Sequence, residues 1–288
     1  MRKHRVFLPA LKPEDVVNME LATQSSAVRI QQQLRDLPTM DQRLRRLTLQ
    51  QLIVHMRAQA ASLYALGGEI SESLQLLDLI PPLALEHFQR RDEHTIGITR
   101  PGHPMVTELS YDSTNSRLNL DCVCLSLAVG QLAIATQIAG LAWDPPDASY
   151  VSLKSSICRP YDQSLAYALK HMLQGEYEEA KRELDRCRVL PSWTRPIEMQ
   201  RMLRGILLRD IADFLDGLTT LLEWYAFARP RDGGYEFWLT SDSVLSHWGL
   251  GLSVLAIHEG LITLDDLPQN DVRLPRQIVE FALSNERP

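Results

Sequence analysis

Glycine and cysteine are scarce in this chain, and their scarcity narrows both its fold class and its chemistry. Only 14 of 288 residues are glycine, and the many Leu, Ala, Gln and Arg residues favour helix over sheet. The four cysteines, Cys122, Cys124, Cys158 and Cys187, have no zinc-type C-x-x-C spacing. On one helix, Cys122 and Cys124 would point roughly 200° apart and would not share a metal. A disulfide framework is not expected at this cysteine density, so the sequence predicts a reducing compartment.

The sequence also lacks the signatures of common enzymes. It has no phosphate-binding loop, dinucleotide fingerprint, zinc-protease helix or G-x-S-x-G nucleophile turn. Two histidines are the candidates for catalysis: His103 in a loop rich in Gly and Pro, and His87, which could form an acid–base or metal set with Glu86 and Glu93. We expect His103 to be a solvated loop residue and His87 to be a surface residue near a helix end. The sequence therefore predicts no enzyme, no cofactor and no metal site.

One long uncharged segment must be weighed against the membrane. From Cys122 to Trp143 there are 22 residues without a charge, which is long enough in principle to span a bilayer. The segment contains polar residues, and Asp121 and Asp144 flank it in place of basic anchors. It therefore predicts a buried central helix over Val123–Leu141. No apolar stretch of signal-peptide length follows the basic amino terminus, so no secretory signal is expected.

Apolar residues recur at helical spacing along most of the chain. Start and stop signals in the first part predict helices over Pro13–Arg35, Asp41–Leu66 and Ser71–Arg91, the last interrupted at Pro81 and Pro82. The region between Asp92 and Asn119 is the least regular. Its segments TIGIT and MVTELSY predict two short strands.

The C-terminal part begins with a short helical hairpin, Tyr161–Cys187, which turns at Gly175. Small and aromatic residues at helical spacing, joined by the tight GEYEEA turn, are typical of tetratricopeptide-like scaffolds. Such scaffolds usually bind another protein. The sequence thus predicts an all-α fold, an array of antiparallel helical hairpins around the buried central helix. We expect a single domain over 1–288, with an irregular insertion at 92–117 and the array at 118–284.

Two long amphipathic segments, Arg195–Ala228 and Ser241–Glu259, follow the hairpin. The first contains LLRDIADF, which predicts a turn at Arg209 and a helix cap at Asp210. Gly260 is a suitable residue to end the second. A final short helix is expected to begin at Pro275.

Charge is unevenly distributed along the chain. Residues 1–60 carry ten Lys and Arg against five Asp and Glu, whereas residues 210–288 carry five against thirteen. Nucleic acid is a poor partner for such an acidic face. A basic protein is a better one, because complementary fields raise association rates. The alternative is an acidic face that is only solvated.

Aromatic and acidic side chains come together around Gly233 and Gly234, and they form the predicted partner-binding edge. The candidate binding residues are Asp232, Tyr235, Glu236, Trp238, Asp242 and His247. Three carboxylates beside aromatic anchors would combine steering charge with contact area. A loop packed over the core would show the same pattern. Trp248, next to His247, continues an apolar helix face and is expected in the core.

Four successive features of residues 118–284 resemble the Immunity 49 family, helical antidotes encoded beside toxins in bacterial polymorphic toxin systems. The features are an alanine-rich uncharged helix (Leu120–Leu141) followed by a connection with Tyr150, the segment ALKHMLQGEYEEA, the segment LRGILLRDIADFLDGLTTLLEWY, and the closing LSHWGLGLSVLAIHEGLITLDD. The closing helix is also similar to that of antidotes against nuclease toxins of the PD-(E/D)xK type. The resemblance implies stoichiometric capture of a toxin domain and carries no catalytic residues.

The resemblance and the residue patterns lead to one expectation for function. It is a cytoplasmic immunity protein that binds and occludes a cognate toxin, with no nucleic-acid or membrane partner. A helical-repeat adaptor with a physiological protein partner is the alternative, and an enzyme using His103 or His87 is a third. A multidomain toxin gene directly upstream would favour the first.

Overall fold

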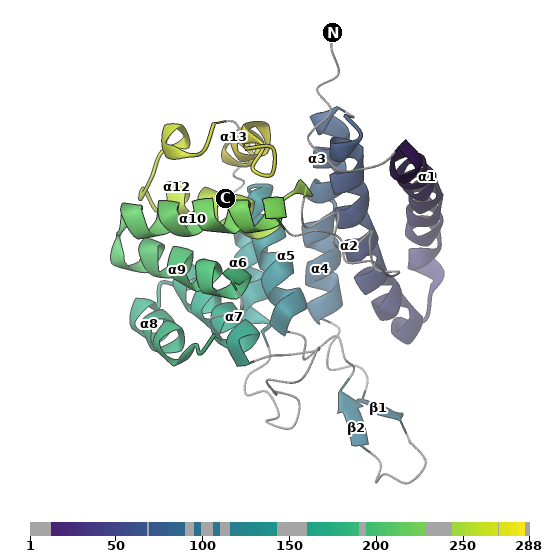
Figure 1. The fold of residues 1–288 in the computed structure, drawn as a ribbon. Coiled ribbons are helices and arrows are strands. Elements are labelled where there is room, and N and C mark those ends of the chain that lie inside the picture. Colours follow the sequence, from purple (N-terminus) through teal and green to yellow (C-terminus); the bar gives the residue numbers. More distant parts are fainter. Residues whose placement is uncertain are drawn as a thin grey trace.

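The computed structural model describes residues 13–67, 69–89, 95–98, 106–109, 116–142, 160–189, 194–227, 244–269 and 271–285. Within these ranges the structure is built almost entirely of helices (Figure 1). The prediction of an all-α fold is therefore confirmed at the level of class. The exception is a small antiparallel hairpin of β1 (Thr95–Ile98) and β2 (Val106–Leu109), which projects from one end of the molecule (Figure 1). The two segments predicted as short strands form it.

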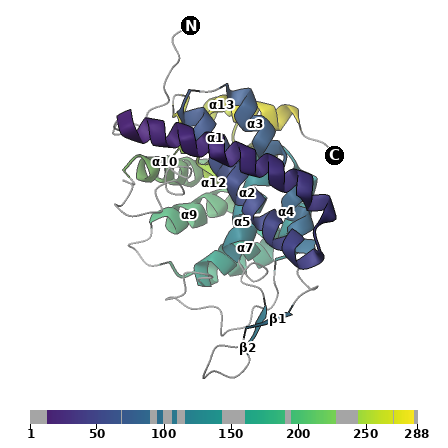
Figure 2. The same cartoon turned by 90° about the vertical axis from the view of Figure 1, so that its right-hand side faces the viewer.

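The N-terminal part is a group of helices stacked around α2. In order, its elements are α1 (Pro13–Asp36), the short 3-10 helix η1 (Leu37–Thr39), α2 (Gln42–Ala65), α3 (Ile70–Asp78) and α4 (Ile80–Gln89). Asp41 caps α2 as predicted, because its carboxylate accepts a hydrogen bond from the Leu44 amide at 2.9 Å. The predicted interruption lies at Leu79, and Pro81 and Pro82 occupy the first turn of α4, where proline is tolerated. Helix α1 lies across α2 at the edge of the molecule (Figure 2).

The C-terminal part is larger and contains two successive helical hairpins. Its elements are α5 (Ser116–Ala128), α6 (Leu132–Gly140), α7 (Pro160–Leu173), α8 (Tyr177–Arg186), α9 (Thr194–Leu208), α10 (Ile211–Phe227), α12 (His247–His258), the 3-10 helix η3 (Leu264–Asp266) and α13 (Arg276–Ser284). Helices α8, α9 and α10 lie on the opposite side of the molecule from α1 (Figure 1). One continuous hydrophobic core includes residues from both parts, from Ile30 to Ala282.

The prediction of one central helix over Val123–Leu141 is wrong in one respect, because this segment forms parts of two helices. Helix α5 ends at Ala128 and α6 begins at Leu132, with Gly130 at a φ of 76° between them. A Cβ atom at Gly130 would lie 2.1 Å from the Ala282 carbonyl oxygen of α13. Gly130 ends α5 in a left-handed conformation, and the Gln131 amide donates to the Ser126 carbonyl oxygen at 2.9 Å. The close approach of α13 also requires glycine here. Among the described residues, no helix has the length and apolar character needed to cross a membrane.

The turn between α9 and α10 lies where the sequence predicts it. Arg209 adopts a φ of 59°, a conformation that is uncommon outside glycine. The Asp210 carboxylate then caps α10 by accepting a hydrogen bond from the Asp213 amide at 3.0 Å. Gly175 and Gly260, with φ of 75° and 63°, end α7 and α12 in the same left-handed conformation.

The crossing of α5 and α12 brings two helix backbones into contact at the centre of the core. A Cβ atom at Gly251 would lie 2.3 Å from the Cys124 carbonyl oxygen. All the residues of α12 from His247 to Ala256 are buried. Since cores resist added volume, α5 and α12 hold this separation only while residue 251 has no side chain.

We predict that Gly251→Ala lowers the free energy of unfolding by about 2 kcal/mol, because the new methyl group must push α12 away from α5. Gly140→Ala is the matched control, since its Cβ would meet only the Gln174 side chain, at 3.6 Å. The control should change stability by less than about 1 kcal/mol. Chemical denaturation of both variants measures the difference, and equal stabilities would contradict the close-packed crossing.

Candidate functional site

Four helices begin around a single buried tryptophan, Trp248. Arg117 lies in the first turn of α5, Asp162 in the first turn of α7, Arg195 in the first turn of α9 and His247 at the start of α12. Because the N-terminal end of each helix carries partial positive charge, the convergence of four such ends favours carboxylates between them. Two are present, Asp121 and Asp162, and both are buried.

Asp121 receives donors from three helices. Its Oδ1 atom accepts hydrogen bonds from Trp248 Nε1 at 2.7 Å and His247 Nε2 at 3.0 Å, and Arg117 Nε lies 3.1 Å away. Its Oδ2 atom accepts from Arg57 Nη1 of α2 at 3.2 Å. The carboxylate therefore ties α2, α5 and α12 together. We refer to Arg57, Arg117, Asp121, His247 and Trp248 as the Asp121 cluster.

The charges in the cluster keep Asp121 ionised. Burial alone raises the pKa of this carboxyl, but Arg117, His247 and Arg57 outweigh burial, so that its pKa lies well below the ordinary value. Arg117 also reaches Asp162, with 3.4 Å between Nη1 and Oδ1. The guanidinium carbons of Arg117 and Arg195 lie 4.0 Å and 4.4 Å from the centre of the Trp248 ring. Both contacts are within cation–π range.

The prediction that His247 binds a partner is wrong. His247 is 2% exposed and bonded to Asp121, so its ring is part of the interior and offers no surface to a partner. The other five candidates, Asp232, Tyr235, Glu236, Trp238 and Asp242, lie outside the described residues. Trp248 is in the core, as predicted.

We predict that Asp121→Asn destabilises the fold by about 3–5 kcal/mol, because the arginines and His247 lose the charge that compensates their burial. Asp185→Asn is the control: Asp185 pairs with Arg204 at the surface, at 2.5 Å, and its loss should cost less than about 1 kcal/mol. Thermal and urea unfolding of both variants provide the measurement. A stability of Asp121→Asn close to that of the control would show that the cluster does not hold the fold.

His87 is buried, which corrects the expectation of a surface position. It is fully enclosed, its Nδ1 atom lies 3.3 Å from the Arg46 carbonyl oxygen, and its Nε2 atom has no hydrogen-bond partner. Burial, followed by the charge of Arg46, lowers the pKa of His87 from 6.5 to about 4, against a smaller opposing effect of the hydrogen bond. His87 is therefore a neutral core residue near neutral pH. His94 and His103 lie outside the described residues.

The lowered pKa of His87 predicts a loss of stability in acid. Between pH 6.5 and pH 4 the unfolded chain protonates this histidine and the folded chain does not. The free energy of unfolding therefore decreases by about 3 kcal/mol as the pH is lowered from 6.5 to 4. In His87→Gln this contribution should disappear. The measurement is the difference between the two stability–pH profiles, with His171→Gln, a more exposed histidine, as the control. Parallel profiles for the parent and His87→Gln would contradict the prediction.

Cysteines and metal ligands are not grouped into a site in the described part of the chain. Cys122 and Cys124 are fully buried on α5, and burial raises the pKa of both thiols, which disfavours the reactive thiolate. Burial likewise raises the pKa of Cys187 to about 12. Among these same residues no group of three His, Cys, Asp or Glu side chains is placed to hold a metal ion.

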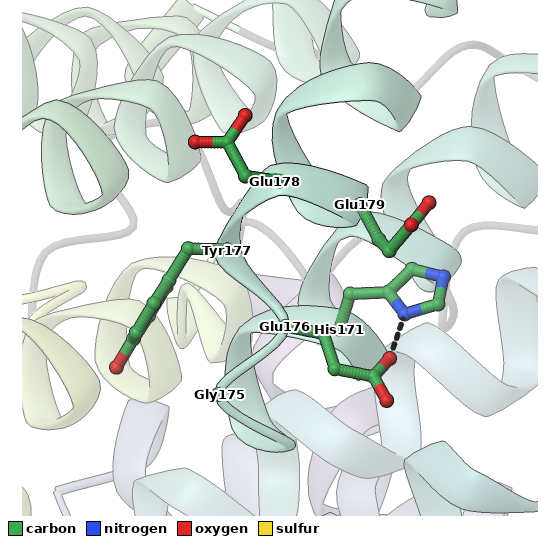
Figure 3. Close-up of a pocket in the computed structure, with 6 residues that line it drawn as sticks. All are labelled: His171, Gly175, Glu176, Tyr177, Glu178 and Glu179. Atoms are coloured by element: carbon green, nitrogen blue, oxygen red, sulfur yellow. Dashed lines mark hydrogen bonds and ion pairs between the residues drawn. The ribbon is translucent and has the colours of Figure 1, made fainter.

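The turn between α7 and α8 forms an open hollow at the surface (Figure 3). Its lining residues are His171, Gly175, Glu176, Tyr177, Glu178 and Glu179. His171 Nδ1 and Glu176 Oε2 are 2.6 Å apart, and the Tyr177 ring points away from this pair and is 48% exposed (Figure 3). Small-molecule sites enclose most of their ligand. This open hollow therefore does not have the form of an enclosed small-molecule site.

The C-terminal part carries an excess of acid on its surface. The exposed acids from α10 onward are Asp210, Asp216, Glu223, Asp265, Asp266 and Glu280; we call them the C-terminal acidic surface. With the half-buried Asp213, Glu259 and Asp271 they make nine acids among the described residues from 210 to 285, against only Arg273 and Arg276, a net charge of −7. Both arginines are paired within the same region, with Asp271 and with Asp265 and Glu280.

Sequence reasoning missed the Asp121 cluster. Asp121 stands at the edge of the uncharged segment, where its charge argues against a membrane anchor. A charge at the border of a buried helix must be paired, and this was the available signal. Its partners Arg57 and Trp248 lie 64 and 127 residues away along the chain, so the sequence alone does not identify them.

Comparisons with protein-family models, with curated proteins and with solved structures found no match for this chain.

Proposed function

We propose that this chain is an immunity protein that captures a toxin domain through its C-terminal acidic surface. The observation that carries the proposal is the net charge of −7 over the described residues from 210 to 285. Six of the nine acids there are exposed, and they extend over α10, η3 and α13. Arg201 of α9 pairs with Asp213 and Asp216, so the surface has an excess of acid and not a single sign. Such an excess attracts a basic partner and raises the association rate.

The mechanism follows from the charge of the partner. Toxins that act on nucleic acid or phosphorylated substrates bind them in basic clefts. An acidic helical surface that enters such a cleft competes with the substrate and blocks access without chemistry of its own. In this proposal the protein is not an enzyme and acts by stoichiometric binding in the cytoplasm, where such a toxin finds its target.

The residues that carry the resemblance to the Immunity 49 family support the same proposal. The segments ALKHMLQGEYEEA and LRGILLRDIADFLDGLTTLLEWY form the hairpins α7–α8 and α9–α10. Helix α7 packs on both α8 and α9. Stacking of successive hairpins is the principle of tetratricopeptide-like arrays, and we include that arrangement in the proposal.

The same stacking favours one second candidate, an adaptor that binds a physiological protein partner. The two candidates share a surface and differ in its occupant. Protection of cells from a toxin distinguishes them, since only an immunity protein confers it.

We predict that a multidomain toxin gene lies directly upstream of this gene and that the chain protects cells in which its toxin domain is expressed. The double variant Asp216→Lys and Glu223→Lys should slow association with that domain by roughly tenfold at low salt. These acids are exposed and lie seven residues apart on α10, which places them on one face of the helix. Because Asp216 also pairs with Arg201, the melting temperature of the variant must match that of the parent before the rates are compared. Stopped-flow association rates at several salt concentrations measure the effect.

The control for this variant is Glu69→Lys with Glu72→Lys, which changes the net charge equally at two exposed acids around the start of α3. It should retain most of the parent's association rate. Equal slowing by both double variants would show that only total charge matters. An unchanged rate for the α10 variant would place the interface elsewhere, and failure of the parent to protect would refute the function.

A further inference from the structure

Two large apolar side chains stand exposed on either side of the α9–α10 turn. Leu208, the last residue of α9, is 59% exposed, and Ile211, the first residue of α10, is 47% exposed. They are two of eight large apolar side chains that are exposed among the described residues, and these two stand together at one turn. Buried apolar surface is a main source of binding free energy. We call Leu208, Asp210 and Ile211 the α9–α10 tip.

The two residues between them have structural roles. The Arg209 guanidinium donates hydrogen bonds to the carbonyl oxygens of Glu259 at 2.5 Å and Gly260 at 2.9 Å, and so caps the C-terminal end of α12. Asp210 caps the N-terminal end of α10. These contacts explain why Arg209 and Asp210 occupy the turn. They do not explain why the exposed positions on either side are leucine and isoleucine.

The tip is held rigidly. A Cβ atom at Gly205 would lie 2.7 Å from the Phe214 amide nitrogen, so α9 and α10 are in backbone contact just below the turn. Arg201 of α9 pairs with Asp213 and Asp216 of α10, which ties the two helices together further along. A rigid apolar projection loses little conformational entropy when it binds.

The tip also lies at the far end of α9 from the Asp121 cluster. Helix α9 begins beside Trp248 at Arg195 and has 15 residues, a length of about 22 Å at the rise of an α-helix. The tip is therefore separate from the buried polar contacts. It is continuous instead with the acids of α10, because Asp210 is part of it and Asp216 and Glu223 follow on the same helix.

We propose that the α9–α10 tip is the apolar anchor of the toxin interface, and that its occupant is an apolar recess bordered by basic side chains on the toxin domain. This inference rests on the proposed function. The charge of the occupant follows from the exposed Asp210 and Glu223, since Asp213 and Asp216 are paired with Arg201. Its apolar recess follows from Leu208 and Ile211. The acids guide approach and set the association rate, while the apolar pair sets the lifetime of the complex.

The test uses the upstream-encoded toxin domain, inactivated by substitution of its catalytic residue, as the probe. Leu208→Ser with Ile211→Ser should bind it roughly 10- to 100-fold more weakly, since two apolar side chains lose their burial. The loss should come from faster dissociation, with the association rate and its salt dependence preserved. The melting temperature should change by less than about 3 °C, because both side chains are exposed.

The matched control is Leu21→Ser with Val28→Ser on α1, where the side chains are 59% and 69% exposed. It should bind as tightly as the parent. Binding by the tip variant equal to that of the control would overturn the inference, and the proposed function would stand if the parent still binds. A parent that does not bind would refute both. A dimer of the parent that only the tip variant dissociates would also overturn it, since the occupant would be a second copy.

Discussion

The fold depends on the ionised state of one buried carboxylate. Asp121 accepts from Trp248, His247 and Arg57 and lies against Arg117, so a single charge links helices from both parts of the chain. Taking a carboxylate out of water is costly. The arginines, His247 and the positive ends of the helices that begin here offset that cost. The specificity of the arrangement lies in its partners: the α2 arginine and the α12 tryptophan reach Asp121 together only in this packing.

The position of the cluster also organises the surface. Because α7 and α9 both begin near it, their C-terminal ends, and the turns that lead to α8 and α10, lie away from it. The exposed Tyr177, Leu208 and Ile211 belong to these two turns. His247, which the sequence predicts as a binding residue, is bonded inside the molecule, whereas these three exposed side chains are apolar or aromatic and are available to a partner.

Local signals in the sequence predicted the parts of the fold that local physics determines. The cap at Asp41, the turn at Arg209 with its cap at Asp210, the end of α7 at Gly175 and the two short strands all depend on neighbours in the chain. The break at Gly130 also has a local signal, because this glycine is left-handed like Gly175. The contact of α13 with Gly130 and the burial of His87 against Arg46 of α2 depend instead on residues far along the chain. Such long-range contacts leave no periodic pattern. The predicted binding loop lies outside the described residues, so the binding site itself remains a prediction.

Charge and apolar contact would have different tasks in the proposed interface. A net charge of −7 among the described residues from 210 to 285 acts over about a Debye length, roughly 8 Å at physiological salt, and it favours any basic surface. It therefore speeds encounter but discriminates poorly between toxins. Discrimination requires contacts that fit only one partner, and a rigid turn with two fixed apolar side chains provides them. An antidote that must act quickly on one toxin needs both, and α10 carries the two together: Ile211 at its first position, and Asp216 and Glu223 along its exposed face.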